Sequence, residues 1–75
     1  MYATYYLTNN TIQDEVILYG LEEDVRNRVK TFYDFVEYAG TSYIFGSLEE
    51  AKNKGIELTV KYPNAGYVYV DDSNL

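Results

Sequence analysis

A short pattern of residues occurs twice in this chain. The segment ILYGLEEDVRNR, residues 17–28, is followed by YIFGSLEEAKNK, residues 43–54, which has one extra residue between the glycine and the leucine. In both copies a run of β-forming residues leads through glycine into carboxylates and then into helix-forming residues. Each copy is therefore predicted to be a strand that passes into a helix. Two such units within 75 residues indicate a small α/β fold.

A glycine before a helix start can also mark a phosphate site, because the exposed amides and the helix dipole attract anions. Here Glu22, Glu23 and Asp24 follow the first glycine, and Glu49 and Glu50 follow the second. Acidic side chains already stabilise these helix ends and would repel phosphate. Neither copy has the lysine or the glycine count of a P-loop. The repeat is therefore interpreted as a structural junction, with Ser47 as the second helix cap.

The rest of the chain completes the order β-β-α-β-α-β in a single small domain, residues 1–75. The predicted strands are Tyr2–Thr8, Glu15–Tyr19, Thr41–Phe45 and Tyr67–Val70. The first helix follows the apolar stripe Leu21, Val25, Val29, Phe32 and Val36, and the second covers Leu48–Tyr62. The end of the chain, residues 70–75, is expected to fray, since it is largely polar from Asp71 onward.

At three places the local sequence allows more than one structure or requires a particular neighbouring contact. The segment TFYDFVEY, residues 31–38, has enough β propensity to form a strand instead of the end of the first helix. A two-residue turn at Asn9 would direct Asp14 toward the apolar face, so a longer loop or a bulge is expected near residues 9–14. Gly55 weakens the second helix unless another group packs closely against it.

Alternation along the strands gives the sheet two chemically different faces. One face is mainly aliphatic and carries Ala3, Tyr5, Leu7, Val16, Leu18, Ile44, Val68 and Val70. The other is aromatic and carries Tyr2, Tyr6, Tyr19, Tyr43, Phe45, Tyr67 and Tyr69. If the strands follow their sequence order in the sheet, right-handed crossovers place both helices on the aliphatic face. We therefore expect a two-layer sandwich, a four-stranded mixed sheet with two helices on one face.

Three interpretations of the aromatic face remain open. The tyrosines only finish the sheet, with their hydroxyls in water, or the strand order reverses and one helix covers them. Alternatively the face binds another protein or a second copy of this chain, as contiguous exposed aromatic patches often do. A third interpretation is stacking on nucleobases, as on RRM-type sheets. The net charge of −6, from twelve acidic and six basic residues, disfavours direct binding to nucleic acids or anionic membranes.

Composition also limits the possible chemistry. Histidine and cysteine are both absent, so the commonest general base and metal ligand is missing and no disulfide forms. No spacing among the remaining polar residues suggests a nucleophile and its base. We expect no enzymatic activity, no catalytic residue, no metal and no cofactor. The lack of cysteine predicts a reducing, cytoplasmic compartment, and the longest apolar run, Val16–Leu21, is too short to span a bilayer.

The sequence thus predicts a non-catalytic, acidic protein-interaction module. The expected contact surface consists of Tyr6, Tyr19, Tyr43, Tyr67 and Tyr69. Two acidic doublets are expected to form an edge that selects a basic partner, Asp14, Glu15, Asp71 and Asp72. A concrete version is a phage or mobile-element protein that blocks a nucleic-acid-binding enzyme. The alternative is a domain that binds a small molecule against the tyrosines, or between two such faces in a homodimer.

Overall fold

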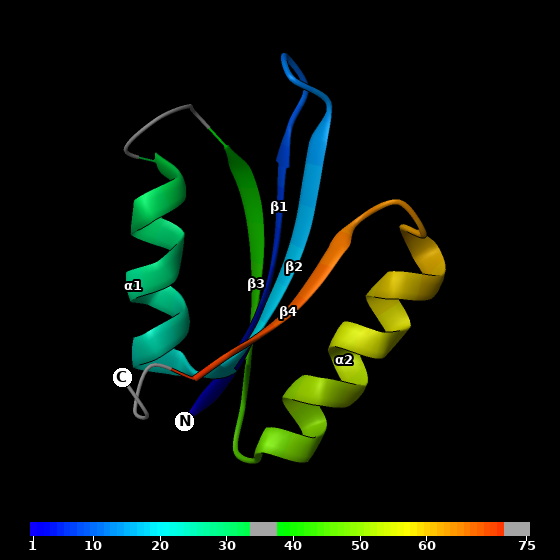
Figure 1. The fold of residues 1–75 in the computed structure, drawn as a ribbon. Helices are drawn as coiled ribbons and strands as arrows, with labels where there is room; N and C mark the ends of the chain where they lie inside the picture. The colour runs from blue at the N-terminus through cyan, green and yellow to red at the C-terminus, as the bar shows by residue number, and fades with distance from the viewer. Residues whose placement is uncertain (34–37, 72–75) are drawn as a thin grey trace.

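The computed structural model describes residues 1–33 and 38–71, with the side chains of residues 32 and 33 left aside. The elements are β1 (Tyr2–Asn9), β2 (Asp14–Leu21), α1 (Glu22–Tyr33), β3 (Ala39–Phe45), α2 (Leu48–Lys61) and β4 (Gly66–Val70). The predicted order β-β-α-β-α-β is confirmed, and so is the four-stranded mixed sheet. Figure 1 shows this sheet between the two helices.

The strands lie in the order β3-β1-β2-β4. β1 is antiparallel to both of its neighbours, β2 and β3, and β4 is parallel to β2. The strands β2, β3 and β4 therefore all run in one direction, and their carboxyl ends lie at the same end of the sheet. β3 and β4 form its two edges.

The helices cover opposite faces of the sheet, so the expectation of a two-layer sandwich with both helices on one face is wrong (Figure 1). The connection from β2 to β3 passes β1 to reach one edge, and the connection from β3 to β4 returns to the other edge. Right-handed crossovers that run in opposite directions place their helices on opposite faces. The molecule has three layers, with α1 on the aliphatic face and α2 on the aromatic face.

The main core lies between α1 and the aliphatic face. It consists of Leu7, Val16, Leu18, Val25, Val29, Tyr38 and Val70, with Tyr5 packed against it. The opposite face has a second buried layer, which includes Thr4 and Ile17 on the sheet and Ala51, Gly55 and Leu58 on α2. Each face of the sheet is therefore occupied, and little of the expected open surface remains.

The two copies of the repeated pattern are both strand-to-helix junctions, as predicted. β2 passes into α1 without a loop, whereas Gly46 and Ser47 separate β3 from α2. The Ser47 hydroxyl accepts a hydrogen bond from the Glu50 amide at 3.2 Å and caps α2. Leu21 was expected on the inner stripe of the first helix, but it ends β2 and is 41% exposed.

The ends of α1, β1 and β4 test three of the expected boundaries. Residues 31–33 belong to α1, and residues 34–37 lie outside the described part of the chain. A four-residue connection, residues 10–13, joins β1 to β2, which confirms the longer loop. Val70 is not part of a frayed tail, because it lies in β4 and is 1% exposed. Residues 72–75 are not described.

Candidate interaction surfaces

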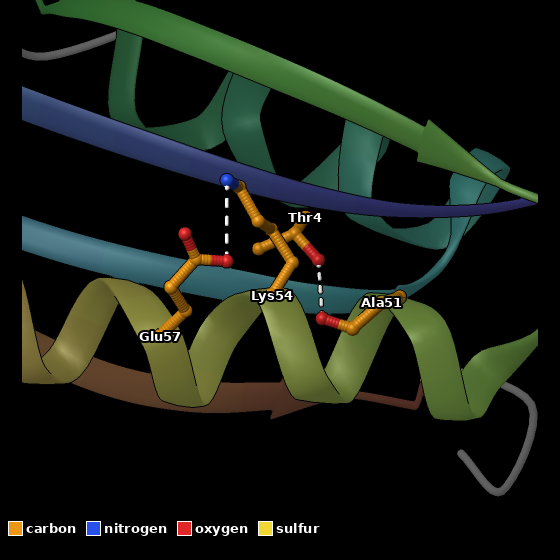
Figure 2. Close-up of polar contacts among 4 residues, drawn as sticks. All are labelled: Thr4, Ala51, Lys54 and Glu57. Atoms are coloured by element: carbon orange, nitrogen blue, oxygen red, sulfur yellow. Dashed lines mark hydrogen bonds and ion pairs between the residues drawn. The ribbon is translucent and has the colours of Figure 1, made fainter.

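Helix α2 approaches the aromatic face closely because its inner residues are small. The Thr4 hydroxyl donates a hydrogen bond to the Ala51 carbonyl at 2.5 Å, and both residues are fully buried. Figure 2 shows this bond joining β1 to α2. One turn further along, Gly55 leaves space for the Tyr67 ring, since a Cβ atom there would lie 2.7 Å from Cε1 of that ring. The group expected to pack closely against Gly55 is therefore the ring of Tyr67.

Tyr6 was predicted to be a contact residue, but the structure uses it internally. Its ring stacks on Tyr62 with 4.1 Å between the centroids, and its hydroxyl donates a hydrogen bond to Glu15 Oε1 at 2.9 Å. Burial and, after it, the hydrogen bond to the Glu15 carboxylate together raise the pKa of the Tyr6 phenol to about 12. Tyr6 therefore holds the end of α2 against the sheet.

Tyr43, on the neighbouring strand β3, is also engaged by α2. The Lys54 ammonium lies 4.5 Å from the centroid of the Tyr43 ring, within cation–π range. The same ammonium lies 3.4 Å from Glu57 Oε2, a contact drawn in Figure 2. Tyr43 is half-buried in this arrangement. It belongs to the packing of α2 on β3.

The remaining three predicted tyrosines form a cluster that we call the β4 tyrosine cluster, Tyr19, Tyr67 and Tyr69. The Tyr19 ring lies 5.1 Å from that of Tyr67 and 5.2 Å from that of Tyr69, measured between centroids. Tyr67 is 39% exposed and Tyr69 is 49% exposed. The Tyr67 hydroxyl lies 3.3 Å from the Lys52 carbonyl, to which it donates. The sheet thus brings together three of the five predicted contact tyrosines at an accessible edge.

The acidic doublets do not act as one edge. Asp14 Oδ2 accepts a hydrogen bond from the Tyr38 hydroxyl at 2.7 Å, on the aliphatic face, and Glu15 is held by Tyr6 on the aromatic face. Asp71 lies at the far end of the sheet, just after β4. Asp72 is outside the described residues. Asp14 and Glu15 therefore each accept a hydrogen bond from a tyrosine hydroxyl, on opposite faces of the sheet, and neither lies beside Asp71.

A different group of carboxylates gathers at one end of the molecule, which we call the acidic end. β2 and β3 finish there and lead into the first turns of α1 and α2, and β4 finishes beside them (Figure 1). The carboxylates at this end are Glu22, Glu23, Asp24, Glu49, Glu50 and Asp71. Sequence reasoning assigned five of these to helix starts, and only the strand order shows that the two helix starts lie together.

Apolar side chains are exposed within the acidic end. Met1 is 66% exposed and Leu21 is 41% exposed, and the Met1 carbonyl accepts a hydrogen bond from the Glu22 amide at 3.0 Å. Partial burial raises the pKa of Tyr69, and the nearby carboxylates of Asp71 and Asp24 raise it further. The β4 tyrosine cluster therefore adjoins the acidic end.

The described residues offer little to a small molecule or a metal ion. One hollow, of about 490 Å³, is lined by the end of β1, the β1–β2 loop, Tyr38 and Ala39. The hydroxyl of Tyr38 is bonded to Asp14, so no group of free tyrosine hydroxyls converges there. Within residues 1–33 and 38–71, no three acidic side chains are grouped to hold a metal ion. Neither described helix has the length and apolar character to cross a membrane.

Comparison with known proteins adds no relative: no family model, curated protein or solved structure matches the chain. The fold and the surfaces define the class on their own. The protein is a small three-layer α+β domain with an acidic end and an exposed aromatic edge strand.

Proposed function

We propose that this protein is a non-catalytic interaction module that binds a basic protein partner through its acidic end. Six carboxylates of the described residues lie at that end, and Glu22 forms an ion pair with Arg26 at 3.7 Å. The single observation that carries the proposal is the exposure of Met1 and Leu21 among these carboxylates. Exposed apolar side chains surrounded by charge are typical of protein contact surfaces, with an apolar centre and a polar rim.

The negative charge at the acidic end also has a structural cause. It arises from carboxylates that stabilise the starts of both helices. Glu22, Glu23, Asp24, Glu49 and Glu50 lie in the first turns of helices, where carboxylates stabilise the helix by about 0.3–1 kcal/mol each. Because both helices start at the same end, these local preferences add up to one negative surface. Such a surface accelerates association with a positive partner and does so less at high salt.

The chemistry favours a protein over a nucleic acid as the partner. Phosphates are repelled by a chain of net charge −6, whereas lysine and arginine side chains are attracted. A specific form of the proposal is a small inhibitor that occupies the basic groove of a nucleic-acid-binding enzyme, with carboxylates in the place of phosphates. The lack of cysteine suits a reducing, cytoplasmic location for such a module.

The experiment is a titration of the isotope-labelled protein with a lysine- and arginine-rich peptide that also carries leucine, followed by NMR amide shifts. We expect shifts centred on Met1, Leu21–Asp24, Glu49, Glu50 and Asp71. Replacing Glu23 and Glu49 by lysine should abolish these shifts. Glu57→Lys serves as the control, because Glu57 is an exposed acid of α2 away from this end, and it should leave the shifts unchanged.

Two results would contradict the proposal. One is a set of shifts spread evenly over all acidic residues, which would indicate non-specific attraction by net charge. The other is an equal loss of binding in the Glu57→Lys variant. A peptide in which leucine is replaced by serine tests the apolar part of the contact, and it should bind more weakly at the same charge.

A further inference from the structure

Strand β4 is an edge strand without the usual protection. It pairs with β2 alone, so the main-chain amides and carbonyls along its outer side face outward. Natural edges are normally blocked by charged side chains, proline or a bulge. The strand Gly66–Val70 contains no charged residue and no proline, and Gly66, Tyr67, Val68 and Tyr69 are all exposed.

The sequence of this strand is symmetric about Val68, since a tyrosine stands on each side of it. We propose that a second copy of this chain pairs with β4 in antiparallel orientation, with the two-fold axis at Val68. This register places Tyr67 opposite the partner subunit's Tyr69, and Val68 opposite the partner subunit's Val68. Antiparallel pairing about a two-fold axis is a closed, self-complementary interface. The two sheets form one continuous eight-stranded sheet.

The side chains that this pairing covers are those that the monomer leaves exposed. On the face of α2, Tyr67 and Tyr69 are 39% and 49% exposed, and their stacking on Tyr19 holds the rings in place. On the face of α1, Val68 is 36% exposed. Aromatic cross-strand pairs are among the more favourable pairs in antiparallel sheets. The strand thus offers apolar area to the second copy on both of its faces.

Helix α2 adds to this surface. Gly55 points at the Tyr67 ring, and each further residue turns about 100° around the helix axis. Ile56 therefore lies on the flank of α2 next to Tyr67, with Val60 one turn beyond it. Ile56 is 45% exposed and Val60 is 79% exposed. In the proposed dimer both α2 helices lie on one face, and these flanks face each other across the paired tyrosines.

Charge selects the antiparallel orientation. A parallel arrangement would bring the two acidic ends together, whereas the antiparallel one holds them at opposite ends of the shared sheet. Asp71 then lies beside the partner subunit's Ala65, in the loop that follows α2 and its terminal lysine. The acids at that end, Asp14 and Glu15, are each occupied by a tyrosine hydroxyl. Within Gly66–Val70 itself, the pairing places no charged side chain opposite another.

The opposite edge is a poorer site for the same pairing. Strand β3 presents four small exposed residues, Ala39, Gly40, Thr41 and Ser42, and one exposed large apolar residue, Ile44, while its aromatic residues are half-buried. It offers less apolar area than the two tyrosines and the valine of β4. The dimer contact at β4 is itself short, below the roughly 800 Å² per partner of a standard interface. We therefore expect a weak dimer, with dissociation in the micromolar range or above.

The test is sedimentation equilibrium of the full chain over a concentration series that extends to millimolar. The mean mass should rise from that of the monomer toward twice that value. Val68→Lys should abolish this rise. Ile44→Lys is the matched control, because Ile44 is 43% exposed, lies on the same face, and belongs to the other edge strand. It should leave the rise intact.

A cysteine variant tests the register without adding charge. The chain has no cysteine, so Val68→Cys introduces a single thiol at the proposed two-fold axis. Mild oxidation should convert this variant to a covalent dimer much faster than an Ile44→Cys variant. A wild-type monomer at millimolar concentration would overturn the proposal, and so would loss of the dimer in Ile44→Lys alone or equal crosslinking of both thiols. Glu23→Lys should leave the dimer intact, which separates this result from a failure of partner binding at the acidic end.

Discussion

The carbonyl oxygen of Val70 occupies the place where a side chain of Gly20 would begin. Gly20 has a φ of 151°, and a Cβ atom built on it would collide with this main-chain oxygen. The two residues face each other in the parallel ladder between β2 and β4. The glycine in the first copy of the repeated pattern is therefore required by the close approach of a strand from the other end of the chain.

This contact predicts a large difference between the two glycines of the repeat. Gly20→Ala should destabilise the fold by roughly 2–4 kcal/mol, because it combines an unfavourable φ with a clash against backbone. Gly46→Ala, at the corresponding position, should change stability by no more than about 0.5 kcal/mol, since no atom lies within 4 Å of its added Cβ. Urea unfolding of both variants measures this. Equal effects would contradict the role assigned to Val70.

A second prediction concerns Gly55 and Tyr67. Alanine normally stabilises an interior helix position over glycine by about 1 kcal/mol. Here the added Cβ lies 2.7 Å from the Tyr67 ring, so Gly55→Ala should displace that ring from Tyr19 and lower the stability. In a Tyr67→Ala background the same substitution should stabilise by about 1 kcal/mol. A Tyr69→Ala background is the control, in which the loss should persist. A gain in all three backgrounds would show that the ring does not restrict α2.

A third prediction concerns the bond between Thr4 and Ala51. Thr4→Val keeps the shape of the side chain and removes the hydroxyl, so it should lower the free energy of unfolding by about 1 kcal/mol. Thr41→Val makes the same change at an exposed position of β3 and should have little effect. Denaturant midpoints with unchanged slopes are the measurement. Equal midpoints for Thr4→Val and the wild type would mean that this hydrogen bond does not stabilise the packing of α2 on the sheet.

The fourth prediction is a loss of stability in alkali. Burial raises the pKa of Tyr6 and of Tyr67 from 10.0 to about 12. Each neutral phenol therefore stabilises the folded state fully below pH 10, and this contribution falls as the pH rises through the folded-state pKa near 12. Tyrosinate absorbance should show late-titrating groups, with one fewer in Tyr6→Phe. The free energy of unfolding should also fall less over this pH range in Tyr6→Phe than in the wild type. An identical fall in both proteins would contradict the contribution assigned to Tyr6.

The order of elements follows from the sequence because it depends on local patterns. Ser47 and Glu50 mark a helix start, and alternating residues mark the strands, so each element forms where its own residues favour it. The strand order depends instead on which distant strand β3 and β4 pair with. No residue within either strand specifies that partner, and the simplest order led to the wrong number of layers.

The internal contacts of Tyr6 and Tyr43 were not foreseen, for a related reason. Their large apolar area and polar hydroxyl suit an exposed contact surface and a half-buried one equally well. The discriminating signal was on the helix, because Ala51 and Gly55 on an inner stripe indicate close approach to something bulky. For Asp14 and Glu15, the donors Tyr38 and Tyr6 are distant or on the other strand, and no local pattern pairs them.

The strand order also has a kinetic consequence. The central hairpin, β1 and β2, is contiguous in sequence, whereas each edge strand joins only after the chain has passed through a helix. Closing a short loop loses less chain entropy, so the hairpin is expected to form first and to serve as the template for β3 and then β4. Each edge strand has a single neighbour in its own chain, so β3 and β4 are expected to open more readily in hydrogen exchange than the central hairpin.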